Sequence, residues 1–262
     1  MSRITQRGQA GPFPLLQTST DASLVTMTGT VWDSPDAREW VLVQNAGTAL
    51  VAGNLIQGPA IIANHQNNTV TAFTAYSANG NQPAQITLTL GATLVTANQY
   101  AGGYAIVNAG TGIGQTLKIA SHPAAALSAS LVVTLEDAPA VALDTSSKVC
   151  LSLNPYGSPN GTDVRTEGVI INPHSAATGQ VIGVSAYAIP ASTSTVASYG
   201  YIVKNGPVAC LNDANTAIGL DLMPSANTDG AVQTYVVATR TRVGVSTQAG
   251  VTTESRLITI QL

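Results

Sequence analysis

Charge is what this sequence has least of. Charged residues make up 9% of the 262 residues, with 10 Lys+Arg against 13 Asp+Glu and a formal net charge of −3, whereas about 25% is usual for soluble domains. A protein that neutralises nucleic-acid phosphates needs a basic surplus, and a disordered chain combines low hydrophobicity with high net charge. Because the sequence has neither property and is 45% apolar, we exclude both classes and expect no nucleic-acid partner.

Residues that build exposed helix faces are also scarce. The chain has three lysines (Lys118, Lys148 and Lys204) and four glutamates, two of the residue types from which such faces are usually made. Threonine and valine, which favour strands, are abundant instead. The composition therefore predicts an all-β protein and argues against an ordinary helical enzyme.

Cysteines are few and long hydrophobic runs are missing. Cys150 and Cys210 are too few for a disulfide framework, and each lies in an apolar strand-like run. We expect two buried thiols, with a disulfide between them left open. No stretch approaches the roughly 18 apolar residues that cross a bilayer, and residues 1–8 lack the apolar run of a secretory signal. We expect synthesis in a cytoplasm and no membrane partner.

The N-terminal region combines glycines, prolines and two arginines with a short apolar cluster. We interpret residues 1–40 as an extended N-terminal arm and lead-in, with a frayed terminus as the alternative for residues 1–20. An arm of this kind would dock on a neighbouring molecule. Its expected contact residues are Arg3, Arg7, Phe13, Leu15 and Leu16.

Short strands separated by turns follow the arm. In residues 84–90, Ile86, Leu88 and Leu90 alternate with polar residues, the pattern of a half-buried strand. Other strand-like runs are expected at 40–44, 103–108, 115–120, 130–135, 147–153, 167–171, 179–184, 199–204, 208–211, 242–245 and 255–262. Such short intervals predict antiparallel sandwich or barrel domains.

A concentration of loop-forming residues at 155–163 is the best candidate for a linker. It divides the strands into two groups. We therefore predict a β-sandwich or barrel domain over residues 41–155 and a small β-barrel over residues 164–262.

The run Gly110-Thr111-Gly112-Ile113-Gly114 resembles a phosphate-binding loop only superficially. A dinucleotide site needs a following helix, whose first amides meet the pyrophosphate, but here a strand-like run follows. A tight hairpin turn, in which glycines adopt positive φ, explains the run better.

Residues with chemical potential do not gather into a motif. His65, His122 and His174 occupy separate turns without a second ligand at metal-binding spacing, so we expect them to hydrogen-bond to backbone. Glu136 and Asp137 are adjacent and precede Pro139, which favours a turn over a glycosidase carboxylate pair. We predict no catalytic residues, no cofactor and no metal, and a protein that is not an enzyme.

The central segment carries a resemblance to a known group of proteins. Residues 90–104 (LGATLVTANQYAGGY) resemble a segment common in structural proteins of tailed bacteriophages. Further similar segments are 47–53 (GTALVAG), 108–115 (NAGTGIGQ), 118–125 (KIASHPAA), 135–139, 142–148 and 154–156. The C-terminal part resembles, more loosely, the small β-barrel of phage head-decoration proteins. The first 40 residues show no close similarity.

The resemblance implies a capsid decoration or cement protein. Such proteins sit on the capsid exterior, bind the major capsid protein and commonly form homotrimers, so the expected location is the virion. Two alternatives stay open. One is a tail- or fibre-associated virion protein, and the other is a glycan-binding β-protein, for which we find neither an aromatic face nor a suitable carboxylate pair.

Overall fold

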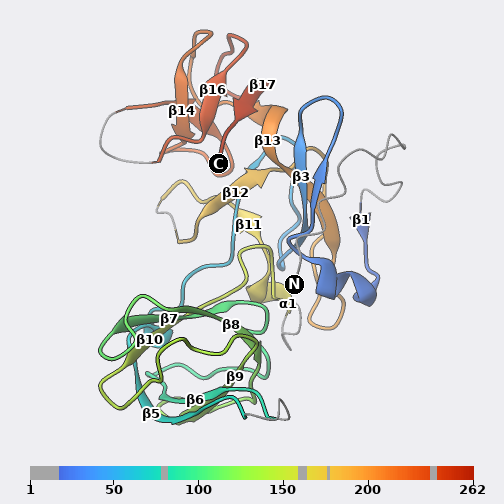
Figure 1. The fold of residues 1–262 in the computed structure, drawn as a ribbon. Coiled ribbons are helices and arrows are strands. Elements are labelled where there is room, and N and C mark those ends of the chain that lie inside the picture. The colour runs from blue at the N-terminus through green and yellow to red at the C-terminus, as the bar shows by residue number, and fades with distance from the viewer. Residues whose placement is uncertain (1–17, 78–81, 159–163, 176–177, 237–240) are drawn as a thin grey trace. The chain divides into compact units, whose positions relative to one another are not determined.

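The computed structural model describes residues 18–77, 82–158, 164–175, 178–236 and 241–262. The regular structure of these residues consists of strands with a few short helical turns, so the all-β prediction is confirmed (Figure 1). The chain forms two compact units. Unit 1 holds the described residues up to Pro59, Pro155–Gly157 and Val164–Leu262, and unit 2 holds the described residues of Ala60–Asn154 together with Ser158.

Unit 2 is a closed antiparallel barrel of six strands, bonded in the ring order β10-β5-β6-β9-β8-β7. The strands are β5 (Asn68–Thr74), β6 (Gln85–Thr89), β7 (Tyr104–Ala109), β8 (Thr116–Ser121), β9 (Ser130–Leu135) and β10 (Lys148–Ser152), preceded by the 3-10 turn η2 (Ala63–His65). The predicted alternation holds in β6, where Ile86 and Leu88 are fully buried and Thr89 is exposed. Because closure pairs every strand on both sides, the barrel has no open edge.

The barrel core is almost entirely aliphatic. Its buried members include Val70, Ile86, Leu88, Leu117, Ile119, Leu131, Val133, Leu135, Val149 and Leu151, with the aromatic ring of Tyr100. Period-two burial in each strand supplies these side chains. The outward positions carry threonines, serines and lysines, together with Tyr104, Ile106, Val132 and Cys150.

Unit 1 is built on an eleven-stranded sheet. Its main path has the order β11-β4-β12-β13-β17-β16-β14-β15, and β1, β2 and β3 join off this path. The bounds are β1 (Thr18–Ser19), β2 (Val31–Asp33), β3 (Glu39–Gln44), β4 (Leu55–Gln57), β11 (Ile170–Ile171), β12 (Val181–Val184), β13 (Tyr199–Leu211), β14 (Asp221–Pro224), β15 (Val232–Thr234), β16 (Gly244–Ser246) and β17 (Ser255–Ile260), with the helical turns η1 (Ala22–Met27) and α1 (Val164–Glu167).

Strand β13 organises unit 1. Its first half pairs with β3, as Tyr199 with Gln44, and its second half pairs with β17, as Ala209 with Leu257. The sequence suggested two runs separated by Asn205-Gly206-Pro207, but the strand is continuous and carries a register shift there. Gly206 has φ +100°, and a Cβ on it would lie 2.4 Å from the Ala37 carbonyl oxygen, so glycine lets the bent strand pass the β2–β3 hairpin.

The observed units differ from the predicted boundaries. Residues 41–59 were assigned to the first β-domain, yet β3 pairs with β13 and β4 pairs with β12 and β11, which places them in unit 1. The described part of the predicted arm and lead-in, residues 18–40, also joins this sheet through β1 and β2. The strands of residues 164–262 therefore share one sheet with the N-terminal strands, and Asn212, directly after β13, bridges Val232 of β15.

Candidate functional site

The predicted arm contacts cannot be placed on the fold. Arg3, Arg7, Phe13, Leu15 and Leu16 all lie outside the described residues. The described chain begins at β1, where Thr18 pairs with Gly200 of β13. The candidate surfaces are those that the described residues form.

One end of the barrel, which we call the glycine end, consists of residues 110–115 and 136–147. The predicted hairpin is confirmed, because β7 and β8 pair across the turn and Gly110, Gly112 and Gly114 have φ of +76°, +80° and +90°. The side-chain amide of Gln115 binds both backbone groups of Val141, at 3.0 and 3.1 Å. Ile113 (67% exposed) and Val141 (49%) are thus presented to solvent on a fixed backbone.

The acidic pair lies in the same region and serves the turn, as predicted. Glu136 forms an ion pair with Lys118 at 2.9 Å, and Asp137 accepts the backbone N–H of Lys118 at 3.0 Å. Both carboxylates are therefore engaged with one residue of β8. They bind the β9–β10 connection to the barrel wall.

The opposite end of the barrel, which we call the histidine end, consists of residues 60–67, 91–103 and 121–129. Val95 and Ala125 exchange two backbone hydrogen bonds of 2.9 Å, and Ser128 donates to the Gly91 carbonyl at 2.8 Å. Leu94 (55% exposed) and Leu127 (60%) project from these clamped segments. The sequence analysis missed both leucines, although an apolar residue next to Gly, Thr or Ser in a connecting segment is the available signal.

The histidines divide into two kinds. His65 and His122 are buried and bind the backbone carbonyls of Thr93 (3.0 Å) and Pro123 (2.8 Å), which confirms the prediction for these two. His174 instead pairs with the Asp229 carboxylate at 2.8 Å and is partly exposed. The prediction of a backbone partner is therefore incomplete for His174, because a carboxylate distant in sequence lies beside it.

The two cysteines lie in different units and are free. Cys210 on β13 is fully buried, and burial raises the pKa of its thiol to about 12. Cys150 occupies an outward position of β10, where its sulfur accepts the Asn67 N–H at 3.3 Å. The expectation of two buried thiols is thus right for Cys210 and wrong for Cys150, whose position in the strand alternation faces outward.

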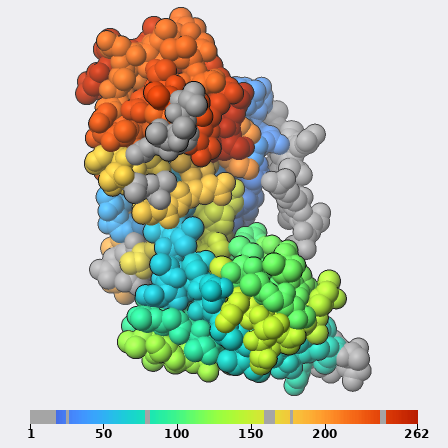
Figure 2. Space-filling model, turned by 90° about the vertical axis from the view of Figure 1, so that its left-hand side faces the viewer, coloured from blue at the N-terminus to red at the C-terminus, as the bar shows by residue number. Residues whose placement is uncertain are grey.

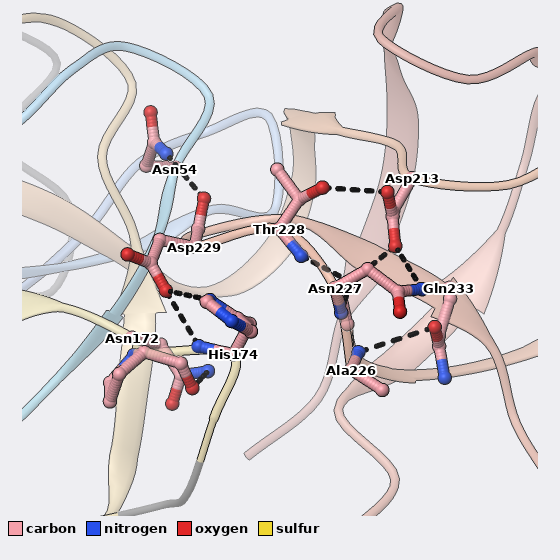
Figure 3. A network of polar contacts seen from close by, with 11 residues as sticks. Asn54, Asn172, His174, Asp213, Ala226, Asn227, Thr228, Asp229 and Gln233 are labelled. Carbon is pink, nitrogen blue, oxygen red and sulfur yellow. Dashed lines mark hydrogen bonds and ion pairs between the residues drawn. The ribbon is translucent and has the colours of Figure 1, made fainter.

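A polar network in unit 1 fixes the loop between β14 and β15 (Figure 3). The Asp213 carboxylate accepts hydrogen bonds from the Ser225 hydroxyl, from Thr228 Oγ1 (2.7 Å) and from Asn227 Nδ2 (3.1 Å). Asp229 accepts both the backbone N–H and the ring Nδ1 of His174, at 2.7 and 2.8 Å. The Ser225 hydroxyl points toward Asp213 and donates to it. Together these hydrogen bonds fix the surface loop between β14 and β15.

The ionisation of the two aspartates reflects this arrangement. Partial burial acts to raise the pKa of Asp213, but hydrogen bonds from Ser225, Thr228 and Asn227 outweigh it and hold the pKa below 3.8. For Asp229, hydrogen bonds from the His174 backbone and ring lower the pKa from the same ordinary value. Both carboxylates are therefore ionised at neutral pH, and neither has the raised pKa of a general acid.

A second network lies inside the C-terminal part of unit 1, whose residues from β14 onward form the orange and red surface of Figure 2. Arg256 is 3% exposed and donates to Asn212 Oδ1 at 2.6 Å and to the Thr216 carbonyl at 3.3 Å. Asn212 in turn donates to the Val251 carbonyl at 3.0 Å. No carboxylate among the described residues pairs with this guanidinium, and it connects two loops through neutral oxygens.

Within the described part of the chain, no group of three or more His, Cys, Asp or Glu residues is placed to hold a metal ion. Among the same residues, no helix has the length and apolar character needed to span a membrane. Comparisons with protein-family models, curated proteins and solved structures gave no match to this chain.

Proposed function

We propose that this chain is a structural virion protein that binds the outer surface of a tailed-bacteriophage capsid and decorates or cements the major capsid lattice. Its partners are the major capsid protein and further copies of itself, arranged as a homotrimer. The segments at 90–148 that carry the sequence resemblance fall on the barrel of unit 2. The proposed role is mechanical and needs no catalytic residue.

The observation that carries the proposal is the presence of large aliphatic side chains on rigid loops at both ends of the barrel. Leu94, Leu127, Ile113 and Val141 are each about half exposed or more. Their loops are fixed by backbone and side-chain hydrogen bonds, so docking costs little additional chain entropy. Apolar contacts on a preorganised, weakly charged surface suit binding to another protein.

Many copies on a regular lattice allow small contact surfaces to produce stable binding. A single copy that buries a small area binds weakly, whereas linked contacts of a trimer on a regular lattice raise the effective concentration of each further contact. Few charges also make such binding insensitive to salt. The shell would be stabilised by many equal contacts.

The test is the number of copies of this chain per purified virion, measured by quantitative mass spectrometry against the major capsid protein. Hundreds of copies, in a simple ratio to the capsid protein, are expected. A dozen or fewer would move the chain to the tail or a vertex and contradict capsid decoration. Absence from the particle would reject both virion roles.

A second test uses the barrel surface. The double variant Leu94→Ser/Leu127→Ser should bind stripped capsids at least several-fold more weakly while its fold is unchanged, because both side chains are exposed. Thr71→Ala, on the exposed wall of β5, is the matched control. Equal affinity of the double variant and the control would exclude the histidine end as the contact surface.

A further inference from the structure

Two buried histidines bind one tyrosine at the histidine end of the barrel, one at its hydroxyl and the other at its backbone nitrogen. His65 is fully buried, Tyr100 is 1% exposed and His122 is 4% exposed. His65 Nδ1 lies 2.5 Å from the Tyr100 hydroxyl, and His122 Nε2 lies 2.9 Å from the Tyr100 backbone nitrogen. The His65 and Tyr100 rings meet edge to face, with centroids 5.5 Å apart.

The partners of the four ring nitrogens determine where the protons are. A carbonyl oxygen can only accept, so His65 Nε2 carries a hydrogen and donates to Thr93 at 3.0 Å, which leaves Nδ1 to accept from Tyr100. In His122 the assignment is reversed, because Nε2 accepts the Tyr100 N–H and Nδ1 donates to Pro123 at 2.8 Å. His122 is therefore neutral, and when His65 is neutral too the two rings are opposite tautomers with every ring nitrogen hydrogen-bonded.

Protonation affects the two rings differently. The Tyr100 hydroxyl can rotate, so it can accept from a protonated His65. The Tyr100 backbone N–H has no such freedom, and a proton on His122 Nε2 would set two donors against each other at 2.9 Å. No carboxylate among the described residues forms an ion pair with either ring, so nothing compensates the buried charge.

These three residues connect the segments that cover this end of the barrel. His65 closes η2 before β5, Tyr100 lies in the connection from β6 to β7, and His122 follows the end of β8. The His122 N–H also donates to Asn98 Oδ1 at 3.0 Å, which ties the same two connections a second time. Loss of the His122 bond would remove one of the links between residues 96–103 and the end of β8, where the backbone bonds from Asn98 to His122 (3.0 Å) and from Gly102 to Ile119 (2.8 Å) remain, and would make opening of this end easier.

We propose that His65, Tyr100 and His122 form an acid-sensitive latch, in which protonation of His122 breaks its bond to the Tyr100 N–H and opens the histidine end of the barrel. The proposal concerns the folded barrel itself and does not depend on the proposed virion role.

The direction of the pH effect follows from burial. Desolvation lowers the pKa of His122 below 6.5, with repulsion from His65 acting in the same sense, and it lowers the pKa of His65 too. A histidine whose pKa is lowered in the fold binds fewer protons there than in the opened state. The latch is therefore fully stable above pH 6.5 and loses stability as the pH falls below that value.

The test is amide hydrogen exchange of the full chain at pH 7 and pH 5, corrected for the intrinsic exchange rate. Peptides covering 96–103 and 121–127 should open more often at pH 5, about tenfold for each unit by which the histidine pKa lies below 6.5 and at most about 30-fold per histidine at this pH. In His122→Gln, an amide oxygen replaces the acceptor and cannot titrate, so this increase should shrink to the part that His65 contributes. His174→Gln, at the partly exposed histidine of unit 1, is the matched control and should keep it.

Equal corrected exchange at the two pH values, or the same increase in His122→Gln, would overturn the proposal. If His122→Gln does not fold, nitrogen NMR of the histidine rings in the unmodified chain tests the proposal, because it reports the tautomer and protonation state of each ring. We expect opposite neutral tautomers for His65 and His122 at pH 7, and no protonated form of His122 while the barrel end is closed. Identical tautomers, or titration of His122 near pH 6.5 without opening, would contradict the latch.

Discussion

The two units reach stability by different routes. The barrel of unit 2 is formed by one nearly contiguous stretch of chain, its strands close on themselves, and its core is aliphatic around Tyr100. The sheet of unit 1 gathers strands from both ends of the chain and remains open. It buries polar groups within it, including Gln44, Asn45, Asn212 and Arg256.

This difference shows what closure provides. A closed barrel satisfies its strand edges by backbone pairing alone, so side-chain polarity is needed only to seal its ends. An open sheet with short strands leaves long connections to organise, and buried polar side chains in unit 1 perform that task. Asn45 Nδ2, for example, donates to the Thr48 carbonyl (3.0 Å) and the Pro190 carbonyl (2.7 Å). We expect the two units to respond to different substitutions.

The largest effect should come from the barrel core. Leu88 is fully buried and lies between Val70 and Leu131 in the register of β5, β6 and β9. Leu88→Ala should destabilise unit 2 by about 3 kcal/mol through lost burial and the cavity left behind. Thr87→Ala, one residue away and facing outward, should change stability by less than about 0.5 kcal/mol. Denaturant unfolding measures both, and a small loss for Leu88→Ala would mean that the barrel core is loosely packed.

The next effect concerns the polar interior of unit 1. Arg256→Met keeps most of the aliphatic volume but removes the donors to Asn212 and Thr216. We expect a loss of about 2 kcal/mol, because both buried acceptors lose a hydrogen bond from a cation. Asn212 Oδ1 then keeps only the Thr216 hydroxyl (3.4 Å), and the Thr216 carbonyl keeps only the Gly250 N–H (3.2 Å). Hydrogen exchange should localise the loss to residues 212–216 and 250–254. Unchanged or increased stability would show that the buried cation costs as much as its hydrogen bonds contribute.

Glycine pairs distinguish backbone strain from steric conflict in each unit. Gly110 and Gly114 both have positive φ. A Cβ on Gly110 would lie 2.1 Å from the Ser146 carbonyl oxygen, whereas a Cβ on Gly114 would have no heavy atom of another segment within 4 Å. Both alanine variants should lose about 1–2 kcal/mol for the left-handed backbone, and Gly110→Ala should lose more. In unit 1, Gly206→Ala and Gly219→Ala form the same comparison. Equal unfolding midpoints within a pair would show that the neighbouring loop yields freely.

The smallest effect is the difference in acid response. Because hydrogen bonds hold the pKa of Asp213 below 3.8, its contribution to the β14–β15 loop is present above that pH and is lost as the pH falls further. The barrel latch should respond earlier, below pH 6.5. Asp213→Asn should lower the stability of the β14–β15 loop by about 1 kcal/mol at pH 7. It should also abolish the loss of loop stability below pH 3.8 and leave the response of the barrel latch unchanged. Circular dichroism and local hydrogen exchange, measured as the pH is lowered, test this order. Opening of the β14–β15 loop at a higher pH than the barrel end would contradict it.

Local rules predicted much of unit 2. The alternation in β6 and the positive-φ glycines between β7 and β8 require only neighbouring residues, and both features are present in the structure. The same rules failed at residues 41–59. The hydrophobic pattern of β3 identifies a strand but not its partner, and β13, far along the chain, supplies that partner.

Candidate sites divide in the same way. The turn role of Glu136 and Asp137 could be predicted from their adjacency and from Pro139, and in the structure both carboxylates bind Lys118 of the neighbouring strand. The pairing of His174 with Asp229, and the burial of His65 beside Tyr100, could not be predicted. Each of these contacts forms only when two connecting segments that are distant in sequence lie side by side. The spacing of single histidines in the sequence does not indicate which segments do so.

The sequence by itself determined the all-β class, the scarcity of charge, the inward faces of the strands and the turns that glycine allows. These features depend on residue type and on a period of two, which are local properties. Only the tertiary structure decided that residues 18–59 complete the C-terminal sheet, that Arg256 is buried without a described carboxylate, and that two histidines share one tyrosine. These outcomes depend on which distant strands pair. Strand pairing is determined by the burial of apolar faces and by the hydrogen bonding of strand edges over the whole chain.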